Sequence, residues 1–292
     1  METIDHIVEK NIEDWDLVIE PKNSLLHLNF REIWRYRYLV VMFVKRDIVS
    51  VYKQTILGPL WFFIQPILTT ITFVVIFGNI AKISTDGLPQ ILFYLAGITV
   101  WNYFSETLTS TSTTFITNAS IFGKVYFPRL VLPMSKVLSG LIKFLIQYAL
   151  FIIVLLFFIV RHANVHPDIK GILVVTPIVI FIMAGLGLGF GLILSALTTK
   201  YRDLVFLITF GIQLGMYATP VIYPMSSITS KYKWIINANP MSSLVEAFRK
   251  VYLGTGDLQW DRLLYSFGIM TLLLVFGTII FNRVEKTFMD TV

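Results

Sequence analysis

The 292-residue chain contains no cysteine, which excludes a disulfide framework, a thiolate nucleophile and a cysteine-based metal site. Charged residues are scarce as well: Asp, Glu, Lys and Arg make up 14% of the chain, whereas 55% is hydrophobic. The mean hydropathy of +0.72 is far above that of a soluble domain. The composition therefore indicates a chain that spends most of its length in lipid.

The usual motifs of catalysis and of energy conversion are missing too. The histidines do not share a helix face with acids at metal-ligand spacing, no Ser/His/Asp set converges, and no Walker A motif occurs. A proton-coupled carrier normally places several carboxylates or histidines within its spans, whereas Glu106 is the only acid inside a predicted span. The sequence thus predicts a protein that is not an enzyme, holds no cofactor, and needs an energy source from elsewhere.

What the chain does have is a series of six long stretches without charge, beginning with Gln54–Ala81. About 20 apolar residues are needed to cross the roughly 30 Å hydrocarbon core of a bilayer. Lipid also forces the backbone to satisfy its own hydrogen bonds, so each stretch predicts a helix. We therefore expect an all-α membrane protein with six transmembrane helices. These spans lie at about residues 56–78, 88–112, 136–160, 171–198, 204–222 and 263–282.

The predicted orientation follows from the basic residues. No signal peptide is expected, because the first residues are acidic and no apolar core follows them. Lys and Arg gather before the first span and in the even-numbered connections, which by the positive-inside rule places both termini in the cytoplasm. The long segment Tyr223–Arg262 departs from this bias. The chain then divides into an acidic tail at 1–29, an interfacial amphipathic helix at 30–55 and a transmembrane domain at 56–292.

The interfacial helix is predicted from Phe30, Ile33, Trp34 and Leu39, which share one helical face bordered by basic residues. Such a helix lies in the headgroup region of the membrane. Two interpretations stay open. The helix is either a simple anchor or, in addition, a docking surface for a cytoplasmic partner.

Three further features each leave two interpretations. Gly185/Gly189 and Gly187/Gly191 form overlapping small-xxx-small pairs, which indicate close helix packing or a hinge. Glu106 either bonds neighbouring helices or serves transport directly. Asn239-Pro240 is typical of a helix start, and predicts short extracellular helices between spans five and six that line an exit or cover the bundle. In that helix we expect Glu246, Arg249 and Lys250 on the polar side.

From about Phe30 onward the chain resembles the membrane subunit of ABC-2-type exporters, specifically those of O-antigen, capsule or teichoic-acid polysaccharides. Four stretches in order carry this resemblance. They are VKRDIVSVYKQTILGPLWFFIQP within Leu39–Pro66, NASIFGKVYFPRLVLP at Asn118–Pro133, TKYRD at Thr199–Asp203, and NANPMSSLVEAFRKVYL at Asn237–Leu253.

The resemblance implies a homodimer with a separately encoded ATP-binding-cassette subunit, which would bind ATP and Mg. It implies export of a lipid-linked polysaccharide across the inner membrane through a central channel. Aromatic side chains suit sugars because their flat faces stack on C–H faces, although any one aromatic is also explained by lipid contact. An ABC-2 permease for a drug, lipid or other small molecule is the first alternative. A membrane-embedded glycan enzyme or an uncoupled channel is the second.

Four groups of residues are predicted to carry this function. Contact with the ATPase is assigned to Arg46, Lys53, Phe122, Lys124, Tyr126 and Arg129. Channel lining is assigned to Trp61, Phe62, Gln65, Gln213 and Tyr217, because polar side chains are costly against lipid. The extracellular gate is assigned to Pro240, Phe248 and Tyr252, and the intramembrane acid is Glu106.

Overall fold

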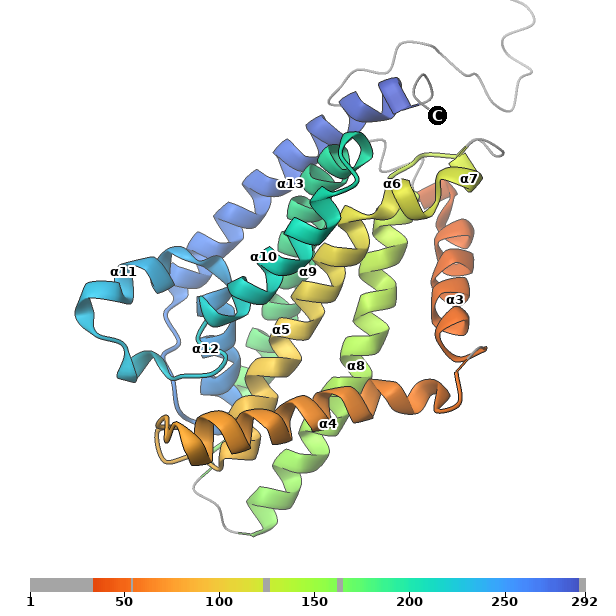
Figure 1. Ribbon diagram of the computed structural model, residues 1–292. Helices are drawn as coiled ribbons and strands as arrows, with labels where there is room; N and C mark the ends of the chain where they lie inside the picture. The colour runs from red at the N-terminus through yellow and green to blue at the C-terminus, as the bar shows by residue number, and fades with distance from the viewer. Residues whose placement is uncertain (1–33, 54, 123–126, 162–164, 289–292) are drawn as a thin grey trace, which may run out of the picture.

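The computed structural model describes residues 34–53, 55–122, 127–161 and 165–288. Within these ranges the chain is helical and contains no strand, as expected for an all-α membrane protein (Figure 1). The predicted tail 1–29 and the start of the predicted interfacial helix lie outside the described residues.

The first half of the described chain contains two long helices and several short ones. They are α3 (Arg37–Lys53), η1 (Gly58–Leu60), α4 (Trp61–Phe73), η2 (Val74–Ile80, a π-helix), α5 (Gln90–Ser112), α6 (Thr114–Thr117), α7 (Ala119–Phe122) and α8 (Val131–Val160). The second half is built in the same way. It contains α9 (Ile169–Lys200), α10 (Leu204–Tyr217), η3 (Met225–Ser227), α11 (Ser230–Ala238), α12 (Pro240–Leu253) and α13 (Trp260–Phe288).

Four helices are long and apolar enough to cross a membrane: Gly58–Ile80, Val131–Val160, Ile169–Lys200 and Trp260–Val284. The second predicted span forms α5, which is long enough, but the hydroxyl-rich run toward its end makes it more polar than the other four. The fifth predicted span was set too long, because α10 ends at Tyr217 rather than near residue 222. With 14 residues at 1.5 Å each, α10 is about 21 Å long, so it is shorter than the hydrocarbon core. Six full spans stay a prediction.

Helices α5 and α9 form the centre of the bundle. They pack against each other, while α13 packs along α9 and α8 along α5. Nearly every residue of Leu92–Tyr103 is buried, which fits this central position. In contrast, α10 has no buried residue, and α4 exposes much of its apolar surface. Figure 1 shows α4 and α10 on the same side of the bundle, in front of α8 and α5.

The glycine pairs of α9 contact two different helices. A Cβ atom added at Gly189 would lie 2.8 Å from the backbone carbonyl carbon of Leu273 in α13. One added at Gly187 would lie 2.8 Å from the Thr107 side chain in α5. Gly185 faces α13 and Gly191 faces α5 in the same way, so the packing interpretation of this stripe is confirmed.

The two ends of the bundle are distinct. Figure 1 shows α6, α7 and the end of α13 at one end, and α11 and α12 toward the other. Helix α12 begins as predicted: Asn239 Oδ1 accepts from the Met241 backbone N–H (3.0 Å), and Pro240 takes the first helical position. Gly254, with φ of 81°, ends the helix in a left-handed conformation that glycine adopts without strain.

Candidate functional site: a polar groove between α4, α5 and α8

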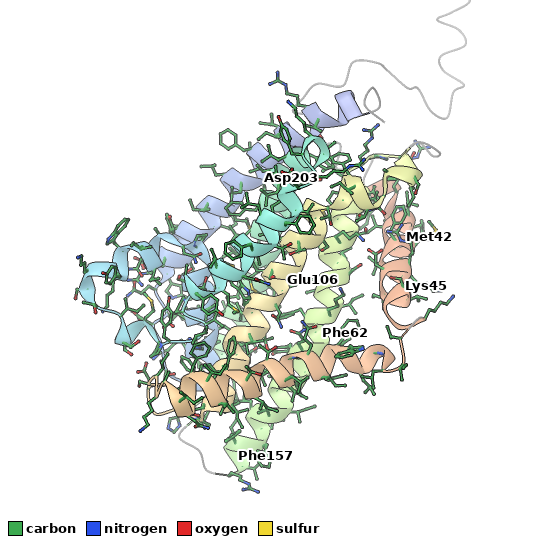
Figure 2. The ribbon with its side chains drawn as sticks, in the orientation of Figure 1. Met42, Lys45, Phe62, Glu106, Phe157 and Asp203 are labelled. Carbon is green, nitrogen blue, oxygen red and sulfur yellow. The ribbon has the colours of Figure 1, made fainter. Side chains whose placement is uncertain are left out.

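A polar groove of about 170 Å³ lies where α4 crosses α5 and α8. Its lining includes Phe62 and Gln65 from α4, Asn102 and Glu106 from α5, and Lys143 and Gln147 from α8. Figure 2 shows Phe62 and Glu106 close together in this region. The groove therefore brings together two predicted channel-lining residues and the predicted intramembrane acid.

Glu106 and Lys143 form an ion pair across α5 and α8, with Lys143 Nζ donating to Glu106 Oε1. One helical turn from each, the Asn102 amide donates to Gln147 Oε1 (3.2 Å). Close approach of the two helices is possible because Gly140 of α8 meets Thr107 and Tyr103 of α5 without a side chain of its own. Glu106 thus bonds a neighbouring helix through Lys143, as its helix-bonding interpretation requires.

The pair is not sealed inside the chain. The side chain of Glu106 is 43% exposed and that of Lys143 is 24% exposed. Both residues lie well inside long helices, and Lys143 lies inside the candidate span Val131–Val160. A charge facing lipid at this depth is expensive, and charged residues in spans normally face a bundle interior or a hydrated cavity. The exposed side of the groove is therefore suited to water or to another protein surface.

Lys143, Asn102 and Gln147 were missed by sequence reasoning. Lys143 lies inside the predicted third span at about 136–160, but only acids and histidines were considered as ionisable functional groups within spans. A helix projection of the region 136–160 places Lys143 and Gln147 on one face, since they are four residues apart, but it does not identify Glu106 as the partner of Lys143.

The other predicted channel residues lie apart from this groove. Trp61, Gln213 and Tyr217 are exposed on the outer sides of α4 and α10. Between α10 and the bundle lies a second, apolar groove of about 420 Å³. Its lining includes Trp101, Phe104 and Phe190, and Pro240 at the start of α12.

The predicted gate residues Phe248 and Tyr252 are buried in the core rather than exposed at a surface. Tyr252 packs on Phe151 of α8, with ring centroids 5.3 Å apart, and its hydroxyl bonds with those of Tyr148 (2.6 Å) and Thr176 (2.8 Å). Exposure of these rings to a channel would require α12 to leave α8 and α9. The gate role stays a prediction.

The polar side predicted for α12 is wrong for two of its three residues. Arg249 is only 1% exposed and Glu246 6%, whereas Lys250 is exposed. The Arg249 guanidinium donates to the carbonyls of Pro220, Val221 and Phe93, and stands 3.6 Å from the centre of the Phe93 ring. Burial lowers the pKa of Arg249 to about 10 and raises the pKa of Glu246. Periodicity alone could not find carbonyls supplied by distant segments.

Some of the residues predicted to contact the ATPase lie in the described part of the chain, and their role stays a prediction. Arg46 of α3 donates to Asn118 Oδ1 (3.1 Å) beside α7, and Lys136 of α8 donates to Asp47 Oδ2 (2.8 Å). The Phe43 and Phe127 rings also pack together, with centroids 5.8 Å apart. The contacts of Asn118 and Phe127 join α3 to the segment 118–133, and that of Lys136 joins α3 to α8. Both α3 and the segment 118–133 carry residues predicted to contact the ATPase.

Two of the other residues predicted to contact the ATPase have described side chains. Lys53 is exposed at the end of α3, and Arg129 lies just before α8. Lys124 and Tyr126 lie outside the described residues, as does the side chain of Phe122. On the predicted apolar face of the interfacial helix, Trp34 is 71% exposed; α3 instead buries Val40, Phe43 and Val44.

Comparison with known proteins extends over most of the chain. Residues 38–253 match the family of ABC-2 type transporters. The O-antigen export system permease protein RfbA of Klebsiella pneumoniae is 28% identical over 253 residues, which cover 86% of this chain and 94% of that protein. The protein of the same name from Myxococcus xanthus is 26% identical over 264 residues, covering 90% and 98% of the two chains. The resemblance found in the sequence is confirmed, and this chain belongs to the ABC-2 type transporter family.

Proposed function

We propose that this chain is the permease of an ATP-driven exporter that moves a lipid-linked polysaccharide across the inner membrane. Two copies form the channel, and a separately encoded ATP-binding-cassette subunit binds ATP and Mg and supplies the energy. Both termini face the cytoplasm. The relatives named as O-antigen export permeases support the cargo.

The observation that carries the proposal is the half-exposed Glu106–Lys143 pair on the face that also presents α4 and α10. Apolar surfaces of α4 and α10 suit contact with lipid or with a second copy of the chain, whereas the polar groove between α4, α5 and α8 does not suit lipid. A second copy placed against α4 and α10 would enclose the groove in a lumen. Neutral polar groups such as Gln65, Asn102 and Gln147 can exchange hydrogen bonds with sugar hydroxyls there.

Coupling to the ATPase is assigned to the end of the bundle that carries α7. The Arg46–Asn118 contact connects α3 to the segment after α5, and the Lys136–Asp47 contact connects α3 to α8. A displacement of α3 would therefore move both. Arg46→Ala should weaken co-purification of the ATPase, whereas Lys45→Ala, at an exposed neighbouring position, should not.

An assay that measures surface glycan directly, rather than cell growth, tests the proposal. Cells without this chain should lose surface glycan and accumulate its lipid-linked precursor inside, and the wild-type gene should restore export. Lys143→Met leaves the Glu106 carboxylate unpaired and should reduce export about tenfold or more, whereas Lys170→Met, at an exposed position in the first turn of α9, should not. Adding Glu106→Gln to Lys143→Met removes the unpaired charge and should recover much of the loss. Normal surface glycan in cells lacking the chain would overturn the proposal.

The apolar groove beneath α10 favours one alternative, a permease for a lipid or a drug. Its aromatic and aliphatic lining suits an apolar ligand. ATP hydrolysis by the assembled transporter distinguishes the two: stimulation by a lipid-linked glycan supports the proposal, and stimulation only by small amphiphiles supports the alternative.

A further inference from the structure

A second polar cavity, of about 350 Å³, lies at the opposite end of the bundle from α7. It is lined by residues of α11, α12, the start of α13 and the turn at Asp86, and it is partly open. We call it the outer cavity. Its volume is at the lower end of the range usual for ligand pockets, roughly 300–1,000 Å³.

Two buried groups on the α12 wall of the outer cavity have no hydrogen-bond partner among the residues that the structure describes. The Ser242 hydroxyl belongs to a residue that is 3% exposed, and Glu246 Oε1 to one that is 6% exposed. The Glu246 carboxylate does accept one hydrogen bond, from the Asp257 backbone N–H. Arg249 Nη1 lies 3.7 Å from Glu246 Oε1, beyond hydrogen-bond reach. Ser242 and Glu246 are four residues apart, so they share one helix face.

The opposite wall consists of polar side chains that are already held in place. Arg262 donates to Asn237 Oδ1 (2.9 Å), and Ser226 donates to Asp86 Oδ1 (2.7 Å). The Tyr265 hydroxyl is held by the Ala238 carbonyl (3.0 Å). Each of these groups keeps further donor or acceptor capacity, because a guanidinium has five N–H groups and a carboxylate two oxygens.

The charges of the lining are nearly balanced, and this decides the class of ligand. Asp86, Glu246 and Asp257 stand against Lys233 and Arg262. A strongly cationic or anionic ligand would gain little from such a mixture, whereas a neutral ligand with several hydroxyls can donate to the acids and accept from the bases. An orphaned buried hydroxyl and carboxylate oxygen cost free energy until such a ligand satisfies them.

We propose that the outer cavity is a binding subsite for one neutral sugar unit, with Ser242 and Glu246 as its anchors. This rests on the proposed function in one respect: if the chain exports a glycan and its termini are cytoplasmic, the cavity lies on the outer side, where the emerging glycan passes. The subsite would hold that end of the glycan against slipping back.

The binding test uses the full-length permease alone, purified in nanodiscs, with saturation-transfer NMR against separate neutral hexoses and deoxyhexoses. At least one sugar should bind, and Ser242→Val should weaken it about tenfold, since the added methyl groups replace a polar anchor. Gln259→Leu, at the rim of the cavity, and Glu246→Gln should also weaken binding. Ser230→Val, at an exposed position of α11 outside the cavity, is the matched control. All variants are first checked for an unchanged elution profile and for a melting temperature no lower than that of wild type.

The outcomes separate the subsite from the proposed function. Absence of sugar binding, or equal binding by wild type and all three cavity variants, overturns the subsite even if ATP-driven glycan export is found. Binding of Ca²⁺ or of a diamine in place of sugars, lost in the same variants, also overturns it. Sugar binding that is lost in the variants upholds the subsite even if the ATPase responds only to small amphiphiles, which would overturn the proposed function.

Discussion

At the scale of one residue, Arg249 is a buried charge whose hydrogen-bond partners come from distant segments. Three backbone carbonyls, from Phe93, Pro220 and Val221, accept from its guanidinium, and Glu246 lies nearby. A buried charge with such partners ties α12 to α5 and to the segment after α10.

Arg249→Leu should be strongly destabilising, because it removes the donor to the Pro220 and Val221 carbonyls, which lie outside the helices, and leaves Glu246 without its nearest cation. Removal of one partner from a buried pair costs about 3–5 kcal/mol. The melting temperature of the purified permease should fall well below that of Lys250→Leu, which changes the exposed neighbour. Equal melting temperatures for the two variants would show that the Arg249 contacts contribute little.

Glu246 should make the stability depend on pH. Burial raises its pKa above the ordinary value of 4.5, with Arg249 acting in the opposite direction and Asp86 and Asp257 acting in the same direction. A group whose pKa is raised by folding stabilises the native state below its unfolded pKa, and this stabilisation is lost as pH rises through the folded pKa. Between about pH 4.5 and neutrality, wild type should therefore lose stability relative to Glu246→Gln. A melting-temperature difference that stays constant over this range would contradict the shift.

At the scale of elements, α9 is a central helix that packs against α5, α8, α12 and α13. Its glycines bring α13 and α5 to backbone distance on two sides, which places Thr107 and Glu106 beside α8 as well. Where lipid gives no hydrophobic drive between helices, such close packing supplies much of the stability.

Gly189→Ala should lower the melting temperature of the permease even though alanine favours a helix. The new Cβ would lie 2.8 Å from the Leu273 carbonyl carbon, so α9 and α13 would have to separate. Gly268→Ala is the matched control, because no other described part of the chain comes within 4 Å of its added Cβ. That variant should be unchanged or stabilised by about 0.5–1 kcal/mol. A Gly189→Ala protein as stable as Gly268→Ala would refute the packing role.

Much of this element level could be predicted from sequence, and the exceptions have physical causes. Charge-free length located the four long helices, and Asn239-Pro240 located the start of α12. The end of α10 was set five residues too late because the run from Leu204 stays apolar through the turn before Pro224. The Glu106–Lys143 pair and the buried Arg249 depend on contacts between segments far apart in the chain, which periodicity does not encode.

At the scale of the whole molecule, α4 and α10 are two of the helices that leave much of their apolar surface uncovered. Both are apolar, both lie on one side of the bundle, and the polar groove between α4, α5 and α8 opens near them. Pairing of two copies through this side would cover the apolar helices and hydrate the groove at the same time.

Cysteines introduced at Gln65 and Gln213 test that arrangement without background, since the chain has none of its own. Each should react with a membrane-impermeant, water-soluble thiol reagent in at least one nucleotide state, and each should cross-link two copies if it lies near the shared axis. A cysteine at Phe157, which Figure 2 shows near the far tip of α8, is the control and should not cross-link. Complete protection of positions 65 and 213 in every nucleotide state would reject this face as the channel.

The most direct test of the central claim is ATP hydrolysis and glycan movement in proteoliposomes that contain this chain and its ATP-binding-cassette partner. The chain shows no nucleotide motif and pairs its one predicted intramembrane acid with a lysine, so movement should require the partner and ATP. We predict that a lipid-linked glycan stimulates hydrolysis, that the glycan crosses only when ATP is present, and that an uncoupler changes little. Glycan movement driven by a proton gradient in liposomes that hold this chain alone would contradict the account.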